Sequence, residues 1–131
     1  MLCNGSEQMA RILIIDDSPT EIFAFSRMLQ AVGYEIITAS SAEDGMVTAR
    51  EQQPDLILMD VVMPGMNGFQ ATRRLTRDPA TARIPIIMVT TKDQEIDRIW
   101  GLRQGARDYV IKPPIEGEFI AKVEAVLAAR N

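Results

Sequence analysis

Short apolar runs alternate with longer amphipathic segments along the chain from residue 11 onward. Five runs rich in aliphatic residues predict β-strands, at 12–15, 35–38, 55–59, 84–89 and 108–111. Three of them are almost continuously apolar, which is typical of parallel strands that are covered on both faces. The segments between the runs predict helices. The pattern therefore favours one doubly wound α/β domain.

The first predicted helix has clear signals at both ends. Ser18 is a candidate N-cap, Pro19 suits the first turn, Glu21 completes a capping box, and Gly33 marks the far end. Its apolar stripe has helical spacing and predicts packing on the sheet: Ile22, Phe25, Leu29 and Val32.

Later helices carry further signals. Ser40 with Glu43 offers a capping box to the second helix, and the last helix has a core stripe of four residues: Phe119, Val123, Val126 and Leu127. For Trp100 on the fourth helix we expect a partly buried packing role rather than a docking role.

Composition narrows the class of protein. A chain of 131 residues with 47% hydrophobic and 24% charged residues fits one soluble domain. The net charge of −4 predicts no nucleic-acid partner, and the apolar runs are too short for membrane insertion. Cys3 has no second cysteine to pair with, so we expect a cytoplasmic protein. Residues 1–8 are polar and are interpreted as an N-terminal extension or an expression remnant that precedes the domain at 9–131.

Reactive residues follow the predicted strands. Asp16 and Asp17 come after the first strand, Asp60 ends the third, Thr90 ends the fourth and Lys112 ends the fifth. In doubly wound sheets, the loops at the carboxyl ends of the strands form the binding site. Because the chain has no histidine, chemistry at this site must use carboxylates, hydroxyls, lysine or a hard metal ion.

Three carboxylates at one sheet edge repel one another unless a cation compensates, and all-oxygen ligands suit Mg²⁺. Asp17 and Asp60 are the candidate direct ligands, Asp16 is a candidate partner of metal-bound water, and the backbone carbonyl of Val62 is a further candidate ligand. The alternative for Asp16 and Asp17 is a pair of acids favoured by the dipole of the following helix.

Asp60 closes the apolar run at 56–59, where an acid is costly unless a cation or hydrogen bonds meet it. Such a carboxylate can act as a nucleophile and carry a phosphoryl group as an acyl phosphate. Lys112 would then supply a positive charge, and Thr90 would donate its hydroxyl to a phosphoryl oxygen. The alternatives are a solvated surface lysine and an ordinary strand-end threonine.

Four segments together resemble one known family. They are 14–18 (IIDDS), 58–68 (LMDVVMPGMNG), 88–91 (MVTT) and 105–113 (GARDYVIKP), and they resemble the response-regulator receivers. The resemblance covers residues 9–131. It implies a flavodoxin-like parallel sheet of order 2-1-3-4-5 with five helices. It also implies a signalling protein, not an enzyme, that assists its own phosphotransfer and dephosphorylation.

The same resemblance implies a role for each matching residue. Asp60 would take its phosphoryl group from a phosphohistidine on a partner histidine kinase, with Mg²⁺ held by the acidic pair Asp16 and Asp17. Thr90 would be the switch hydroxyl, and Tyr109 the switch aromatic that moves inward on phosphorylation. Lys112 would contact the phosphoryl group, and the bond between Lys112 and Pro113 would be cis.

Several segments resemble the twitching-motility receivers of type IV pilus chemosensory systems more closely: 18–21, 67–73, 90–95, 100–101 and 103–109. This resemblance implies an output protein related to the pilus motor. A flagellar-type chemotaxis receiver, or another stand-alone receiver, is the alternative. Because the sequence stops at Asn131, we expect signalling through protein docking or through competition for phosphoryl groups as a phosphate sink.

Two other classes of protein are alternatives for this fold and site. A flavin-binding electron carrier would need a phosphate-binding loop after the first strand, where Asp16 and Asp17 would repel phosphate. An aspartyl phosphohydrolase would need a general acid or base beside Asp60, and the following residues, Val61 and Val62, offer none.

Overall fold

A computed structural model describes residues 10–130 of the protein. Five strands form one sheet, and five helices connect or follow them. In chain order the elements are β1 (Arg11–Ile15), α2 (Pro19–Gln30), β2 (Glu35–Ala39), α3 (Ala42–Gln52), β3 (Leu56–Met59), α4 (Gly68–Arg77), β4 (Ile86–Thr90), α5 (Glu95–Gln104), β5 (Asp108–Ile111) and α6 (Glu116–Ala129).

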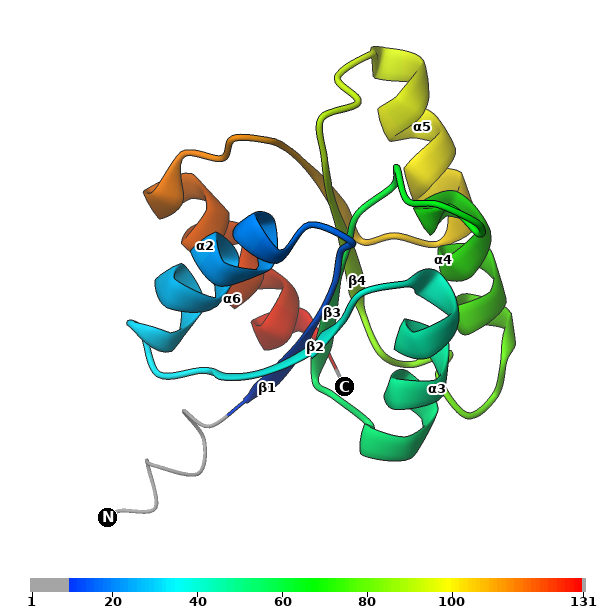
Figure 1. Cartoon of the computed structure of the whole chain (residues 1–131), viewed down its shortest axis with the longest axis horizontal. Helices are drawn as coiled ribbons and strands as arrows, with labels where there is room; N and C mark the ends of the chain where they lie inside the picture. Colours follow the sequence, from blue (N-terminus) through cyan, green and yellow to red (C-terminus); the bar gives the residue numbers. More distant parts are fainter. Residues whose placement is uncertain (1–9, 131) are drawn as a thin grey trace.

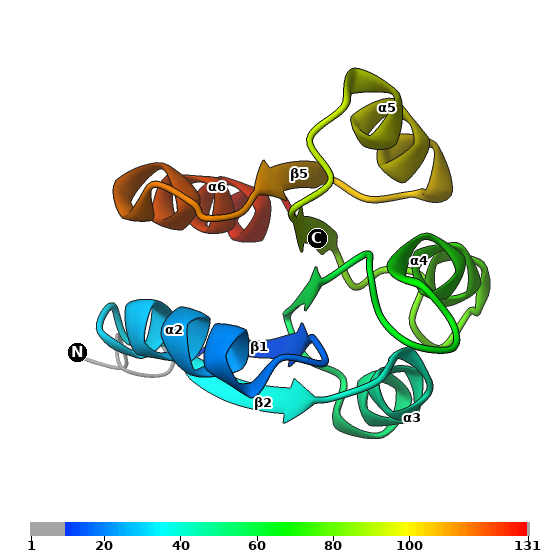
Figure 2. The same ribbon diagram turned by 45° about the horizontal axis from the view of Figure 1, so that its top comes forward.

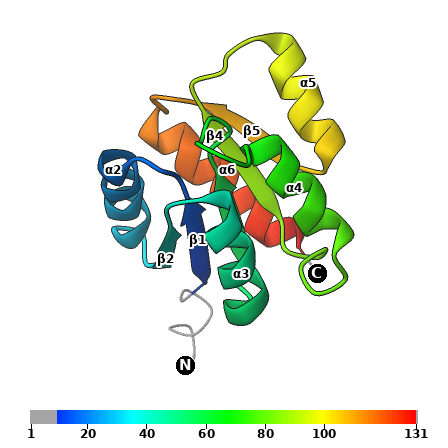
Figure 3. The ribbon, with the colours of Figure 1, turned by 45° about the vertical axis from the view of Figure 1, so that its right-hand side comes forward.

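The sheet has the order β2-β1-β3-β4-β5, and every neighbouring pair is parallel. The α/β class and the predicted order 2-1-3-4-5 are therefore confirmed. Helices α2 and α6 cover one face of the sheet, and α3, α4 and α5 cover the other (Figures 1 and 2). Helix α4 lies between α3 and α5 and contacts both (Figure 3).

Successive side chains of the strands point to opposite faces, so the sheet builds two cores. In β1, Leu13 and Ile15 pack beneath α3 and α4, whereas Ile12 and Ile14 pack beneath α2 and α6. The core beneath α2 and α6 includes most residues of the apolar stripes predicted for the first and last helices. Its helical members are Phe25 and Leu29 of α2, with Phe119 and Val123 of α6, all buried; Ile22, Val126 and Leu127 are half-buried against it.

Val32 does not belong to the predicted stripe of the first helix. Helix α2 ends at Gln30, and the chain leaves it through a turn in which Gly33 has a φ of 100°. Val32 lies in this turn and is 47% exposed. The helical spacing of the stripe continues to Val32, but the helical backbone ends two residues earlier, at Gln30, and Gly33 completes the turn that follows.

The helix starts differ in detail from the prediction. The hydroxyl of Ser18 accepts a 3.3 Å hydrogen bond from the backbone N–H of Glu21, as predicted, but the N–H of Ser18 donates to Asp16 rather than to Glu21. At α3 the cap is Ser41, whose hydroxyl accepts from Asp44, and not Ser40.

The packing role predicted for Trp100 is wrong, because its side chain is 47% exposed. The buried residues of α5 are Gly101 and Gln104. A Cβ added to Gly101 would lie 2.7 Å from the sulfur of Met88 and 3.2 Å from the ring of Tyr109. The glycine lets the helix backbone approach the sheet closely, which turns Trp100 away from the core.

Within residues 10–130, no helix combines the length and the apolar character needed to cross a membrane. The extension predicted at residues 1–8 lies outside the described part of the chain.

Candidate functional site

The strand ends bring three acids together. Ile15 of β1 is paired in register with Met59 of β3, and the N–H of Asp60 donates a 3.0 Å hydrogen bond to the carbonyl of Ile15. Asp16 and Asp60 therefore leave neighbouring strands at the same level. A carboxylate oxygen from each of Asp16, Asp17 and Asp60 lies within 4.8 Å of the others.

Backbone hydrogen bonds orient the two buried acids. Asp16 is 3% exposed and its Oδ1 accepts from the N–H of Ser18 at 2.9 Å, while Asp60 is 7% exposed and its Oδ1 accepts from the N–H of Val61 at 2.9 Å. Asp17 is exposed. Within the described residues, no donor is bonded to Oδ2 of Asp60, so this oxygen is available to a reactant.

Lys112 reaches into the same cluster from the end of β5. Its Nζ donates a 2.7 Å hydrogen bond to Oδ2 of Asp16 and lies 3.6 Å from Oδ1 of Asp60. Its side chain is only 8% exposed, so the alternative of a solvated surface lysine does not fit. Glu21 lies 3.7 Å from the same Nζ. Sequence reasoning missed Glu21 as a site residue because it read the acid as part of a capping box.

Burial and crowding change the proton affinity of these groups. Burial and the adjacent charge of Asp16 raise the pKa of Asp60 from 3.8 to about 6, although Lys112 and the Val61 N–H act in the opposite direction. Burial lowers the pKa of Lys112, but the hydrogen bond to Asp16 and the surrounding carboxylates outweigh burial and raise it overall. The cluster thus holds more negative charge than one lysine balances well.

Thr90 and Tyr109 lie on the adjacent strands β4 and β5, and both are buried. The Thr90 hydroxyl accepts a 3.3 Å hydrogen bond from the N–H of Lys92, and the Tyr109 hydroxyl donates a 3.0 Å hydrogen bond to the carbonyl of Lys92. Burial, with the charges of nearby aspartates, raises the pKa of Tyr109 to about 12. Tyr109 already occupies an inward position here, so inward movement is not needed to bury it.

The remaining predicted residues lie in the loops around the cluster. Val62 is 57% exposed, two residues beyond Asp60. The peptide bond between Lys112 and Pro113 is cis.

Gly68 is a site residue that sequence reasoning passed over within its motif. Its N–H donates to the carbonyl of Val61 at 2.9 Å, and a Cβ added there would collide with the carbonyl oxygen of Asp60. Glycine therefore lets the first turn of α4 close against the backbone that carries Asp60. A glycine directly after an N-cap asparagine was the signal available.

Comparison with known proteins decides the family. The protein-family model called response regulator receiver domain matches residues 12–124 of this chain. The chain belongs to the response-regulator receiver family.

Relatives within this family differ in length. Protein PilH of Pseudomonas aeruginosa is 56% identical over 120 residues, which cover 92% of this chain and 99% of PilH. The transcriptional regulatory protein AfsQ1 of Streptomyces coelicolor is 42% identical over 120 residues, but these cover only 52% of AfsQ1. This chain therefore covers nearly the full length of PilH but only about half the length of AfsQ1.

Solved receivers share the fold. The chemotaxis protein CheY4 of Vibrio cholerae superposes with a TM-score of 0.84 at 30% identity, over 90% of this chain and 98% of that one. The receiver domain of a sensor histidine kinase from Pseudomonas aeruginosa superposes with a TM-score of 0.85 at 28% identity, over 92% of this chain and 99% of that one. That structure has a magnesium ion coordinated in the active site cleft.

The acidic cluster of this receiver fits a hard divalent cation. Its donors are all oxygens, burial and the charge of Asp16 raise the pKa of Asp60, and Asp17 is exposed to solvent. Family membership favours a signalling receiver over the flavin-carrier and phosphohydrolase alternatives.

Proposed function

We propose that the protein is a single-domain response regulator that accepts a phosphoryl group on Asp60 from a partner histidine kinase. The observation that carries the proposal is the placement of Asp60: a buried carboxylate with one oxygen free of hydrogen bonds, between Lys112 and two further acids. With a pKa of about 6, this carboxylate is mostly ionised at neutral pH and is available as a nucleophile.

In the proposed reaction, Oδ2 of Asp60 attacks the phosphorus of a phosphohistidine. The new O–P bond forms as the P–N bond breaks, and the imidazole nitrogen of the donor keeps the electron pair. Lys112 then contacts a phosphoryl oxygen, and the Thr90 hydroxyl turns from the N–H of Lys92 to donate to another. The chain mainly positions these groups, as is general for phosphoryl transfer.

Asp17 and Asp60 are the proposed direct ligands of Mg²⁺, with Asp16 holding a metal-bound water and the Val62 carbonyl as a further ligand. When bound, Mg²⁺ neutralises charge on the phosphoryl oxygens and offsets the repulsion among the acids. The oxygen donors of the cluster and the raised pKa of Asp60 support this assignment.

Phosphorylation tests the acceptor. Acetyl phosphate with Mg²⁺ should add the mass of one phosphoryl group to the intact protein, and mild base should remove it. Asp60→Asn should stay unmodified because an amide is not a nucleophile here. Asp44→Asn, at the exposed start of α3, is the matched control and should be modified like the parent. Equal modification of Asp60→Asn would overturn the assignment.

Thermal unfolding tests the metal ligands. Mg²⁺ at about a hundred times its dissociation constant should stabilise the folded protein by about 2.7 kcal/mol. Asp17→Asn should lose most of this shift, whereas Asp44→Asn should keep it. A full Mg²⁺ response in Asp17→Asn would exclude Asp17 as a ligand.

We further propose a cytoplasmic role in type IV pilus twitching motility, through an output protein related to the pilus motor or as a phosphate sink. Two observations support this role. The chain is 56% identical to PilH over 99% of that protein, and several of its segments resemble twitching-motility receivers. Phosphotransfer from each histidine kinase of the source genome, combined with motility of a strain carrying Asp60→Asn, tests this role. Altered swimming with normal twitching would favour the flagellar-type alternative.

A further inference from the structure

Positive charge is concentrated on two neighbouring segments of the fold. Helix α4 (Gly68–Arg77) and residues 98–107, which form most of α5 and the turn after it, contain no Asp or Glu. Together they carry six arginines: Arg73, Arg74, Arg77, Arg98, Arg103 and Arg107. The whole chain has a net charge of −4, so the remainder of the molecule is strongly acidic.

Within residues 10–130, these six arginines and Arg83 have no salt-bridge partner, unlike most of the other arginines. Arg11, Arg50 and Arg130 each lie within salt-bridge distance of a carboxylate, and the guanidinium of Arg27 lies over the ring of Phe23. Across residues 10–130, no carboxylate pairs with any of the six arginines. All six are exposed. Their charges are therefore available to a partner.

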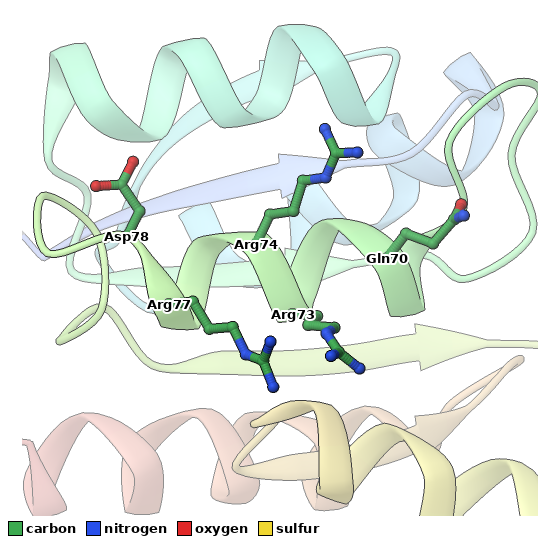
Figure 4. Close-up of a pocket in the computed structure, with 5 residues that line it drawn as sticks. All are labelled: Gln70, Arg73, Arg74, Arg77 and Asp78. Carbon is green, nitrogen blue, oxygen red and sulfur yellow. The ribbon is translucent and has the colours of Figure 1, made fainter.

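The arginines of α4 line a shallow groove together with Gln70 and Asp78. Arg73 and Arg77 are one helical turn apart and point to the same side, whereas Arg74 points toward α3 (Figure 4). Like charges at this spacing repel. The helix dipole of α4 stabilises the positive charges of Arg74 and Arg77, because both lie in the last turn of the helix. Arg73 lies before that turn and does not gain this stabilisation. Helix stability alone therefore does not explain the pair.

The C-terminal end of α5 packs against the C-terminal part of α4. The hydroxyl of Thr76 on α4 donates a 3.0 Å hydrogen bond to the carbonyl of Gln104, and a Cβ added to Gly105 would lie 2.7 Å from Thr76. Arg103 and Arg107 flank this junction in the sequence. The two arginine-bearing segments thus pack directly against each other at this junction.

The overall charge selects the kind of partner. A nucleic acid or an anionic membrane extends well beyond a Debye length of about 8 Å and would also meet the acidic remainder of the molecule. A short acidic polypeptide segment can lie along α4 alone, where the local charge is positive. Arginine is also well suited to bind carboxylates, because its planar fork donates two parallel hydrogen bonds.

We propose that α4 and the adjoining end of α5 form a docking surface for a short acidic segment of a partner protein, centred on Arg73 and Arg77. This surface is separate from the Asp60 cluster, so the proposal goes beyond phosphorylation and does not depend on it. The partner identified by this chemistry carries Glu or Asp side chains spaced to meet two guanidinium groups.

Fluorescence anisotropy with a labelled peptide of alternating Glu and Ala, about ten residues long so that it exceeds the length of α4, tests the surface. The parent should bind at low salt and lose affinity at physiological salt. Arg73→Gln/Arg77→Gln should bind about fivefold more weakly. Arg11→Gln/Arg27→Gln removes the same charge from other surfaces and should bind like the parent. Both double variants should give the circular dichroism spectrum of the parent, which shows that they fold.

Three results would overturn the proposal. The first is no peptide binding by the parent at low salt. The second is an equal loss in both double variants, because net charge rather than the α4 surface would then explain binding. The third is tighter binding to single-stranded oligothymidine or to phosphatidylserine vesicles than to the peptide, which would assign the surface to another class of anion.

Discussion

The ammonium group of Lys112 donates a 2.7 Å hydrogen bond to Oδ2 of Asp16. Its distance to the nearest oxygen of Asp60 is longer, at 3.6 Å. The lysine is therefore held by the neighbouring acid in this structure, and contact with a phosphoryl group on Asp60 requires it to exchange partners. Its charge meanwhile limits the repulsion among the clustered carboxylates.

We expect Lys112→Met to lower the free energy of unfolding by about 2 kcal/mol without Mg²⁺, because two buried acids lose their nearest cation. Urea denaturation measures the effect, and added Mg²⁺ should restore part of it. Lys122→Met removes the ion pair between Lys122 and Asp108, whose side chains are 42% and 34% exposed. Its cost should stay below about 1 kcal/mol. Equal costs for the two variants would contradict the role given to Lys112.

The raised pKa of Asp60 predicts a pH-dependent gain in stability for Asp60→Asn. Below pH 3.8 the group is protonated in both states, and between 3.8 and about 6 the folded protein retains a proton that the unfolded chain has lost. The parent therefore loses stability as pH rises through this window, and the full penalty, up to about 3 kcal/mol, is present above it. Asp60→Asn has no ionisable group at this position, so this loss of stability does not occur in the variant.

Urea denaturation without Mg²⁺ at about pH 4 and about pH 7.5 tests this expectation. The gain of Asp60→Asn over the parent should be larger at the higher pH. Asp44→Asn controls for the loss of one exposed negative charge. A gain that is independent of pH would mean that ionised Asp60 is not destabilised in the folded protein.

The contact of Gly68 with the backbone of Asp60 predicts that Gly68→Ala is destabilising. The new methyl group must displace the loop, at a cost of about 1–3 kcal/mol, and phosphorylation by acetyl phosphate should slow because Asp60 moves. Gly117→Ala on α6 is the matched control, since its Cβ would meet no atom within 4 Å. That variant should gain up to about 1 kcal/mol. Similar stabilities for the two variants would contradict the close approach at Gly68.

A hydrogen-bonded relay predicts how the signal leaves the site. The peptide groups of Lys92 bond to both hydroxyls, accepting from Tyr109 and donating to Thr90. Beryllofluoride with Mg²⁺ mimics a phosphoryl group, and it should shift amide NMR signals as far as α5 in the parent. In Thr90→Ala the shifts should stay near Asp60, whereas Thr91→Ala should behave like the parent. The same spread in Thr90→Ala would show that Thr90 does not transmit the change.

Much of the fold follows from local pattern. Nearly continuous apolar runs such as 56–59 identified buried parallel strands, and the acids after them identified the site edge, because the carboxyl ends of parallel strands converge. Element boundaries were less well determined. Ser40 and Ser41 both have an acid three residues later, so the choice of Ser41 as the cap of α3 depends on where β2 ends against β1.

Other features depend on contacts between distant segments. The exposure of Trp100 follows from the close approach of Gly101 to Met88 and Tyr109, which helical spacing does not reveal. The ion pair between Lys112 and Glu21 joins the residue that follows β5 to a residue of α2, and only the folded sheet brings them together. Sequence pattern located three acids of the site and the lysine that balances them, but not Glu21, the further acid beside that lysine.

The glycine contact of α5 also sets the local stability of that helix. Helices α2 and α6 are fixed by large buried side chains, whereas the buried positions of α5 are Gly101 and Gln104. The helix itself buries little apolar side-chain surface, so its opening should require less free energy than opening of α2 or α6 or global unfolding. The helix that covers Tyr109 is thus the part of the fold that a small change in free energy at Asp60 can move most readily.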